Sequence, residues 1–144
     1  MNGFELTEQK INQLVELALR ARERAYVPYS HFRVGACLMS KNGTLYCGCN
    51  IENAGYTPTN CAERTAIFKA VYEGERQFSA IAVASDSDNF TAPCGVCRQV
   101  MAEFCDPDSF FIVVAESESD YEIRTLRKLL PEGFGSGNLA DCIQ

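Results

Sequence analysis

Residues 93–104, PCGVCRQVMAEF, place a Cys-x-x-Cys pair at the start of a predicted helix that runs from about Gly95 to Phe104. Two thiols at this spacing can reach one ion, and the unpaired N–H groups at a helix N-terminus lower the pKa of a thiol. A thiol–disulfide redox pair and a zinc site both need these electrostatics. Cys94 and Cys97 therefore indicate one of these two chemistries without deciding between them.

A third cysteine, Cys61, begins another predicted helix, which runs to about Tyr72 and is closed by Gly74. Zinc takes tetrahedral ligand sets, and a catalytic zinc site keeps one position for water. Three thiolates and one open position meet that requirement, and the single histidine, His31, is distant in sequence. Together the three cysteines favour catalytic zinc over structural zinc or redox chemistry.

Glu63 lies two residues after Cys61. On the first turn of a helix, a carboxylate there can approach the open side of the metal and transfer a proton. The alternative is a surface glutamate that favours a helix N-terminus. Because three thiolates outweigh the charge of Zn²⁺, positive groups are also expected near the sulfurs. Arg64 and Arg98 are candidates for that role, or else solvated surface residues.

The remaining chain alternates helices with strands. Such an order predicts an α/β protein with a mixed sheet covered on both faces, and no internal repeat divides residues 1–144, so we expect a single domain. The expected elements are an amphipathic helix from the N-cap Thr7 to about Ala25, strands at 32–38 and 44–50 around a type I′ Asn42-Gly43 turn, strands at 79–84, 110–115 and 121–124, a short helix at 126–130 and an irregular tail.

Composition and charge narrow the function classes. With a net charge of −6, the chain lacks the excess positive charge that favours binding to nucleic acid or anionic membranes. No apolar run reaches the length of about 20 residues that a membrane-spanning helix needs. The N-terminal residues 1–5 lack the features of a secretory signal, so we expect a cytoplasmic protein with reduced thiols rather than a disulfide scaffold. The cysteines outside the two motifs are expected to pack as small core residues: Cys37, Cys47, Cys49, Cys105 and Cys142.

Much of the chain, about residues 11–135, resembles the small homotetrameric, zinc-dependent cytidine deaminases. A Cys-x-Glu followed by Pro-Cys-x-x-Cys is the signature of zinc nucleobase deaminases. The resemblance implies a three-layer α/β/α sandwich around a mixed five-stranded sheet. It also implies hydrolysis of cytidine and deoxycytidine to uridine and deoxyuridine in pyrimidine salvage. The matching strings are YSHFRVGA at 29–36, NIENAGY at 50–56, CAERTA at 61–66, PCGVCRQ at 93–99 and LLPEGF at 129–134.

The resemblance implies a role for each matching residue. One Zn²⁺ per chain would be held by Cys61, Cys94 and Cys97, with Glu63 as the proton shuttle and Arg64 hydrogen-bonded to a ligand sulfur. The implied substrate contacts are Phe32 stacked on the pyrimidine, Asn50 and Glu52 at the ribose hydroxyls, the backbone of Ala54 at the base, and Tyr56 and Phe134 in the site of a neighbouring subunit.

The chemistry of Asn50 and Glu52 also favours binding to ribose. Neutral Asn50 and anionic Glu52 can bind vicinal hydroxyls, whereas the glutamate repels phosphate, which favours a free nucleoside over a nucleotide. Turn chemistry at a strand end is the alternative for Asn50. Three rival functions stay open: a blasticidin-S-type or other free-nucleoside aminohydrolase, a nucleic-acid deaminase, and a non-catalytic zinc module or thiol oxidoreductase.

Overall fold

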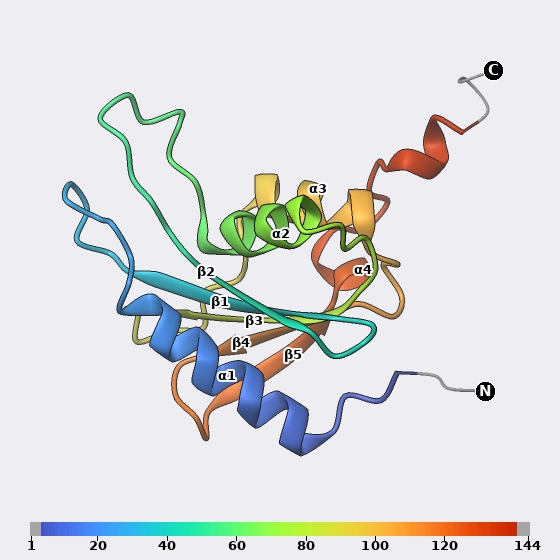
Figure 1. Cartoon of the computed structure of the whole chain (residues 1–144), viewed down its shortest axis with the longest axis horizontal. Coiled ribbons are helices and arrows are strands. Elements are labelled where there is room, and N and C mark those ends of the chain that lie inside the picture. The colour runs from blue at the N-terminus through green and yellow to red at the C-terminus, as the bar shows by residue number, and fades with distance from the viewer. Residues whose placement is uncertain (1–3, 141–144) are drawn as a thin grey trace.

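A five-stranded sheet lies between α1 on one face and α2 and α3 on the other in the computed structural model, which describes residues 4–140 (Figure 1). The elements are α1 (Glu8–Arg22), β1 (Val34–Ser40), β2 (Leu45–Cys49), α2 (Ala62–Tyr72), β3 (Phe78–Ser85), α3 (Gly95–Phe104), β4 (Phe111–Ala115), β5 (Tyr121–Thr125), α4 (Leu126–Leu129) and the 3-10 helix η1 (Ser136–Asn138). The predicted three-layer α/β/α architecture is confirmed. Within the described residues, no helix is both long enough and apolar enough to span a membrane.

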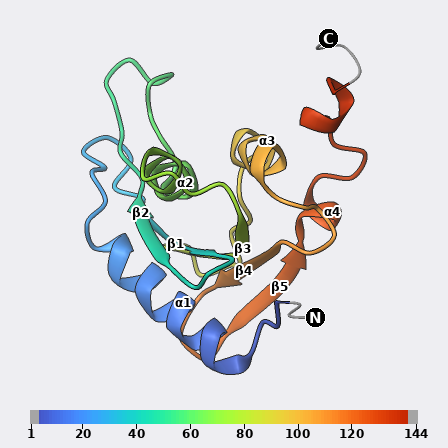
Figure 2. The ribbon, with the colours of Figure 1, turned by 45° about the vertical axis from the view of Figure 1, so that its right-hand side comes forward.

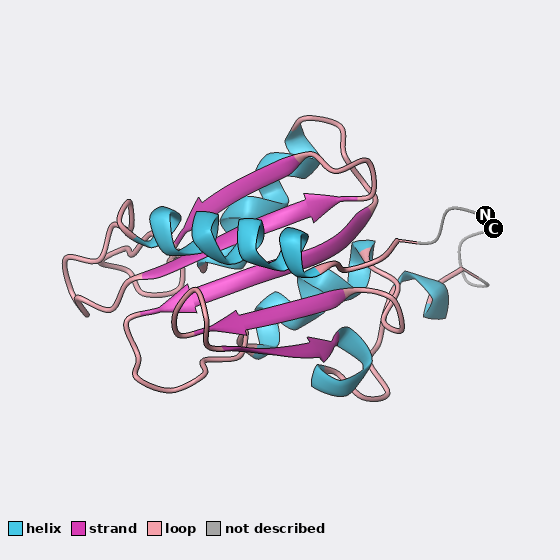
Figure 3. Ribbon diagram, turned by 90° about the horizontal axis from the view of Figure 1, so that it is seen from below, coloured by secondary structure: helices cyan, strands magenta, loops and turns pink. Residues whose placement is uncertain are grey.

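The sheet is mixed, in the order β2-β1-β3-β4-β5. Only β3 and β4 pair in parallel, and the other three pairs are antiparallel (Figure 3). Since β1 is antiparallel to both β2 and β3, these two strands run in the same direction. The connections from β2 to α2 and from β3 to α3 therefore leave the sheet at the same end.

Two hydrophobic cores fill the spaces between the sheet and its helices, and Figure 2 shows these helices on the two faces of the sheet. Successive residues of β1 point to opposite faces, so Cys37 and Met39 pack beneath α1 while Ala36 and Leu38 pack beneath α2 and α3. The central strand β3 is buried along its whole length. Burial on both faces explains why its sequence is a continuous apolar run without alternation.

Gly48 brings α2 close to the edge strand β2. A Cβ at this position would lie 2.5 Å from the backbone nitrogen of Ala66 and 2.6 Å from the carbonyl oxygen of Ala62. Only a residue without a side chain permits this approach. The close approach fixes the first turns of α2 against the sheet.

The hairpin between β1 and β2 differs from the predicted type I′ turn. Gly43 has a φ of 89°, but Asn42 is not among the residues with positive φ, whereas a type I′ turn requires positive φ at both central residues. The Gly43 N–H donates to the carbonyl of Ser40 at 3.0 Å, and the Ser40 N–H donates to the carbonyl of Thr44 at 2.9 Å. This is the pattern of a three-residue loop with a glycine bulge.

Other boundaries shift slightly from the sequence-based expectation. Helix α1 ends at Arg22, because the next residues form i to i+3 turns, including a bond from Ala25 N–H to Arg22 carbonyl. Strand β1 begins at Val34, so Phe32 lies just outside the sheet. Among the predicted core thiols, Cys37 and Cys105 are buried, Cys47 and Cys49 are partly exposed, and Cys142 lies outside the described residues.

Candidate metal centre and active site

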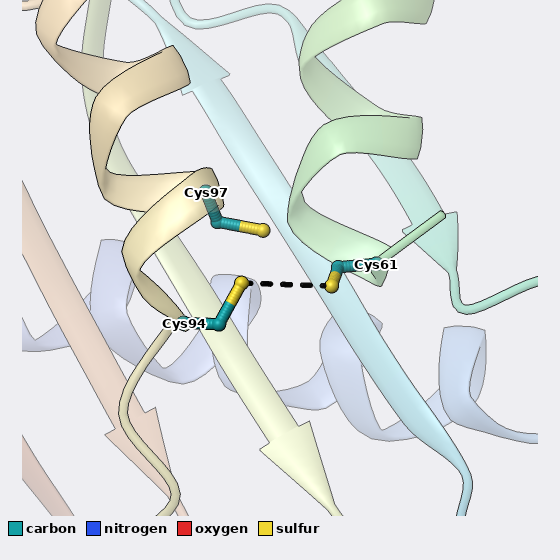
Figure 4. A group of neighbouring side chains, drawn as sticks. All are labelled: Cys61, Cys94 and Cys97. Carbon is teal, nitrogen blue, oxygen red and sulfur yellow. Dashed lines mark hydrogen bonds between the residues drawn. The ribbon is translucent and has the colours of Figure 1, made fainter. Parts of the chain in front are cut away.

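Three thiols from two helices converge at the end of the sheet where α2 and α3 begin. Cys61 is the N-cap of α2, Cys94 is the N-cap of α3, and Cys97 lies in the first turn of α3. Their sulfur atoms lie within 4.8 Å of one another, and the Sγ atoms of Cys61 and Cys94 are 3.8 Å apart (Figure 4). The sequence prediction that these three cysteines form one cluster is therefore met by the geometry.

The cluster fits a zinc ion. Two sulfurs that each lie about 2.3 Å from a tetrahedral zinc are separated by about 3.8 Å, which matches the distance between Cys61 and Cys94. Among the described residues, no histidine, aspartate, glutamate or further cysteine joins the group. Three protein ligands and one open position are the arrangement of a catalytic zinc site.

Positive groups surround the sulfurs, as their combined negative charge requires. Nη2 of Arg64 donates a hydrogen bond to Sγ of Cys61 at 3.2 Å. The pKa of Cys61 is lowered to about 5 by a hydrogen bond from the Cys97 thiol and by Arg64, against the opposing effect of burial. The N-termini of α2 and α3 add further positive potential.

Arg98 donates its hydrogen bonds to backbone carbonyl groups and makes none to the three sulfurs. Its Nε donates to the carbonyl of Pro93 at 2.7 Å, and its Nη1 donates to the carbonyl of Leu129 at 2.6 Å. The side chain thus ties the start of α3 to the end of α4. Both bonds satisfy backbone acceptors, which gives Arg98 a structural role in this part of the fold.

Glu63 is buried beside the thiols, with only 4% of its surface exposed. It lies on the first turn of α2, and burial raises the pKa of its carboxyl group. The surface-glutamate alternative is therefore wrong. A buried carboxyl group next to an open metal position is suited to accept and return a proton.

A cavity of about 260 Å³ opens onto this carboxyl and two of the thiols. Phe32 and Asn50 line it, as expected for substrate-contacting residues. Residues that the sequence analysis did not single out complete the walls: Val34, Thr59, Asn60, Ala62, Val83, Thr91 and Ala92. Asn60 precedes Cys61 directly and Thr91 lies shortly before Pro93, so adjacency to the motifs was the only signal available for them.

Asn50 also holds the wall of the cavity together. Its Oδ1 accepts a hydrogen bond from the N–H of Val34, and its Nδ2 donates to the carbonyl of Phe32, each at 2.9 Å. One side chain thus bridges the backbone on both sides of Arg33. This leaves one N–H of the amide for another partner.

Glu52 lies in an adjoining pocket of about 410 Å³ that it shares with Tyr56. Thr59 lines both this pocket and the cavity that contains Glu63. Oε1 of Glu52 accepts hydrogen bonds from the backbone N–H groups of Tyr29 and Ser30. Hydrogen bonds from Ser30 and Tyr29 lower the pKa of Glu52, so the carboxylate carries its charge at neutral pH.

Two predicted site residues lie away from the thiols within this chain. Ala54 is exposed in the loop between β2 and α2 and does not line the cavity that contains Glu63. Phe134 is 55% exposed, and its carbonyl accepts a hydrogen bond from Gln99. The described chain alone does not bring these two residues to the metal centre.

Three thiols around an open metal position, beside a buried carboxyl group and an apolar-walled cavity, define a zinc-dependent hydrolytic enzyme of the deaminase class. The family model for the cytidine and deoxycytidylate deaminase zinc-binding region matches residues 8–113. The chain belongs to this family.

Relatives and solved structures agree with this assignment. The chain is 50% identical over 130 residues to a cytidine deaminase of Sporosarcina psychrophila, covering 90% of this chain and 95% of that protein. It is 49% identical over 128 residues to a cytidine deaminase of Halalkalibacterium halodurans, covering 89% and 96%. The crystal structure of cytidine deaminase from Burkholderia pseudomallei superposes with a TM-score of 0.81 at 46% identity, covering 85% of this chain and 97% of that one.

Proposed function

We propose that the protein catalyses the zinc-dependent hydrolytic deamination of cytidine and deoxycytidine to uridine and deoxyuridine, with release of ammonia. The observation that carries this proposal is the position of buried Glu63 on the same cavity as the Cys61 and Cys94 thiols. The strong similarity to cytidine deaminases over most of the chain supports the choice of substrate.

Cys61, Cys94 and Cys97 would hold the metal. When bound, zinc makes a water at its fourth position more acidic and positions it for attack. Glu63 would accept a proton from the attacking water and deliver it to ring N3 as the oxygen adds to C4. Glu63 would then take the remaining proton of the hydroxyl group on C4 and transfer it to the amino group, so that the C4–N bond breaks, a C4 carbonyl forms and ammonia leaves. Arg64 stabilises the negative charge on the Cys61 sulfur throughout.

The substrate would lie between the two walls of the cavity. Phe32 is 38% exposed there and offers an aromatic face to the pyrimidine ring. The free N–H of Asn50 and the second carboxylate oxygen of Glu52 would bind the ribose hydroxyls. The backbone of Ala54 would contact the base. A negative charge on Glu52 disfavours a phosphate group at the same place, which favours nucleosides over nucleotides.

We also propose that residues 1–144 act as one domain within a cytoplasmic homotetramer, in which Tyr56 and Phe134 complete the site of a neighbouring chain. Support comes from the exposed apolar side chains on α2 and α3, among them Phe68, Tyr72 and Val96, which need a covering surface. Light scattering should give about four times the chain mass of 15.9 kDa. A mass near that of one chain would overturn the shared site.

The decisive experiment is an ultraviolet assay of cytidine and deoxycytidine turnover with the purified enzyme. Both substrates should be deaminated, a zinc chelator should abolish the activity, and added Zn²⁺ should restore it. Blasticidin S serves as a parallel substrate because it tests the nearest alternative. Failure of a zinc-loaded enzyme to deaminate either nucleoside would overturn the proposal.

A further inference from the structure

A second pair of thiols lies under α1, on the face of the sheet opposite to α2 and α3. Cys37 of β1 and Cys47 of β2 are directly opposed partners in the antiparallel ladder. Both pack in the core beneath α1, whereas the helices that carry the metal ligands cover the other face. This pair is therefore separate from the metal centre and has no part in the chemistry described above.

The backbone pattern places these two residues at the closest Cα approach that an antiparallel sheet allows. At one end of the ladder, the Asn50 N–H donates to the carbonyl of Val34, and at the other the Ser40 N–H donates to the carbonyl of Thr44. Because the two kinds of pair alternate along an antiparallel ladder, Cys37 and Cys47 form a non-hydrogen-bonded pair. Cα atoms of such pairs are about 4.5 Å apart, within the range of about 4.4–6.8 Å found in disulfides.

The surroundings of Cys47 favour its thiolate. The residue is partly exposed and lines a pocket of about 440 Å³ whose cationic side chains are Arg20, Arg24 and Lys69. A hydrogen bond from the Cys37 thiol and the charge of Lys69 lower the pKa of Cys47 to about 7, against the effect of burial. Cys37 is fully buried, and its hydrogen bond with Cys47 raises its own pKa. The pair thus combines an accessible thiolate with a protected thiol.

We propose that Cys47 and Cys37 form a peroxide-reactive dithiol that closes into a cross-strand disulfide. The Cys47 thiolate attacks a hydroperoxide, the O–O bond breaks, and Cys47 becomes a sulfenic acid while the peroxide leaves as an alcohol or water. The Cys37 thiol then attacks the Cys47 sulfur, forms the S–S bond and releases water. In total, two thiols lose two hydrogen atoms and one hydroperoxide is reduced.

Cys49 provides a matched internal control. It lies on the same strand and lines the same pocket as Cys47, but its directly opposed partner is Gly35. Burial raises the pKa of Cys49, and its thiol donates to the carbonyl of Arg24 at 3.3 Å. It therefore lacks both a low pKa and a second thiol across the ladder.

The test treats the zinc-loaded enzyme with one equivalent of hydrogen peroxide at pH 7, quenches with acid, and maps the thiols by alkylation and mass spectrometry. Cys47 should be oxidised about tenfold faster than Cys49. A Cys37–Cys47 cross-linked peptide should appear, and dithiothreitol should remove it. Zinc content should remain unchanged while the disulfide forms.

Three variants separate the roles of the thiols. Cys49→Ala should form the disulfide at the wild-type rate. Cys37→Ala should stop at a Cys47 sulfenic acid that dimedone traps, and Cys47→Ala should leave Cys37 unreacted. The proposal is overturned if the wild-type cross-link is missing, if Cys49 reacts as fast as Cys47, or if zinc is lost first. If the Cys37 variant does not fold, the cross-link and the oxidation rates measured in the wild-type protein decide the proposal.

Discussion

Arg33 and Asp86 bind each other through four hydrogen bonds. The backbone N–H, Nε and Nη2 of Arg33 donate to the Asp86 carboxylate at 2.9, 3.0 and 3.1 Å, and the Asp86 N–H donates to the Arg33 carbonyl at 3.0 Å. Arg33 follows Phe32, and Asp86 begins the loop that leads to Cys94. This pair therefore joins the aromatic wall of the cavity to the segment that carries two metal ligands.

The Arg33–Asp86 pair predicts a specific pH dependence of stability. A hydrogen bond and ion pair with Arg33 lower the pKa of Asp86 below its ordinary value of 3.8. The pair therefore stabilises the fold fully above that value, and this contribution disappears as the pH falls through the lower folded value. Asp86→Asn should lower the melting temperature at pH 7, and the difference from wild type should shrink as the pH falls below 3.8. A difference independent of pH would contradict this account.

Glu63→Gln should reduce kcat by about 10²–10⁴-fold while zinc remains bound, because the amide keeps the shape of the side chain but cannot move a proton. Steady-state assays and metal analysis of the same preparation measure both effects. Glu73→Gln, an exposed change just after the same helix, should leave both unchanged. Activity of Glu63→Gln within tenfold of wild type would remove Glu63 from the mechanism.

Arg64→Gln should weaken zinc binding by about 10–100-fold, because the hydrogen bond to the Cys61 sulfur and its positive charge are lost. Competition with a chromophoric chelator measures the affinity. Arg98→Gln is the contrasting variant: its bonds reach only carbonyl groups, so its melting temperature should fall with little change in zinc affinity. Equal losses of affinity in the two variants would argue against a distinct role for Arg64.

Asn50→Ala should lower stability as well as substrate affinity. The side chain pairs with the partly buried Val34 N–H and with the exposed Phe32 carbonyl, and losing hydrogen bonds of this kind costs about 0.5–1.5 kcal/mol. Denaturant unfolding should detect that loss, and KM for cytidine should rise. An increase in KM with unchanged stability would show that the bridge contributes little to the fold.

Gly48→Ala should destabilise the protein by about 3 kcal/mol, since the new methyl group would overlap two backbone atoms of α2. Any shift of α2 also moves Cys61 and Glu63, so kcat should fall with stability. Gly137→Ala is the matched control, because a Cβ there has no neighbour within 4 Å. Wild-type stability of the Gly48 variant would mean that α2 is free to move outward.

The sequence was sufficient to predict the order of the elements and the cluster of Cys61, Cys94 and Cys97, because periodicity and ligand spacing are local properties. It misassigned the Asn42-Gly43 turn, since loop length and not the dipeptide alone decides the turn type. The two hydrogen bonds of Arg98 were likewise not predicted from the sequence. A partner 31 residues away, the Leu129 carbonyl, is a tertiary contact that no local pattern encodes.

The residues of the cavity walls also could not be predicted from local sequence patterns. Thr59 and Ala92 have no chemical signature, and their position follows from where two loops meet in space. Phe134 and Ala54 show a further limit, because the described chain leaves them apart from the thiols. The proposed role of Phe134 depends on a second chain, which neither periodicity nor spacing within one chain can reveal.

The N-termini of α2 and α3 converge at the metal site. A bound metal would therefore connect two segments of the chain that are distant in sequence. Cys61 is on one side of β3 in the chain, and Cys94 and Cys97 are on the other, so the complete ligand set exists only after both connections have folded onto the sheet. A ligand that binds the folded state alone adds to stability by mass action. Zinc occupancy should therefore set the protein's resistance to heat and proteolysis, and metal scarcity would lower the amount of enzyme as well as its turnover.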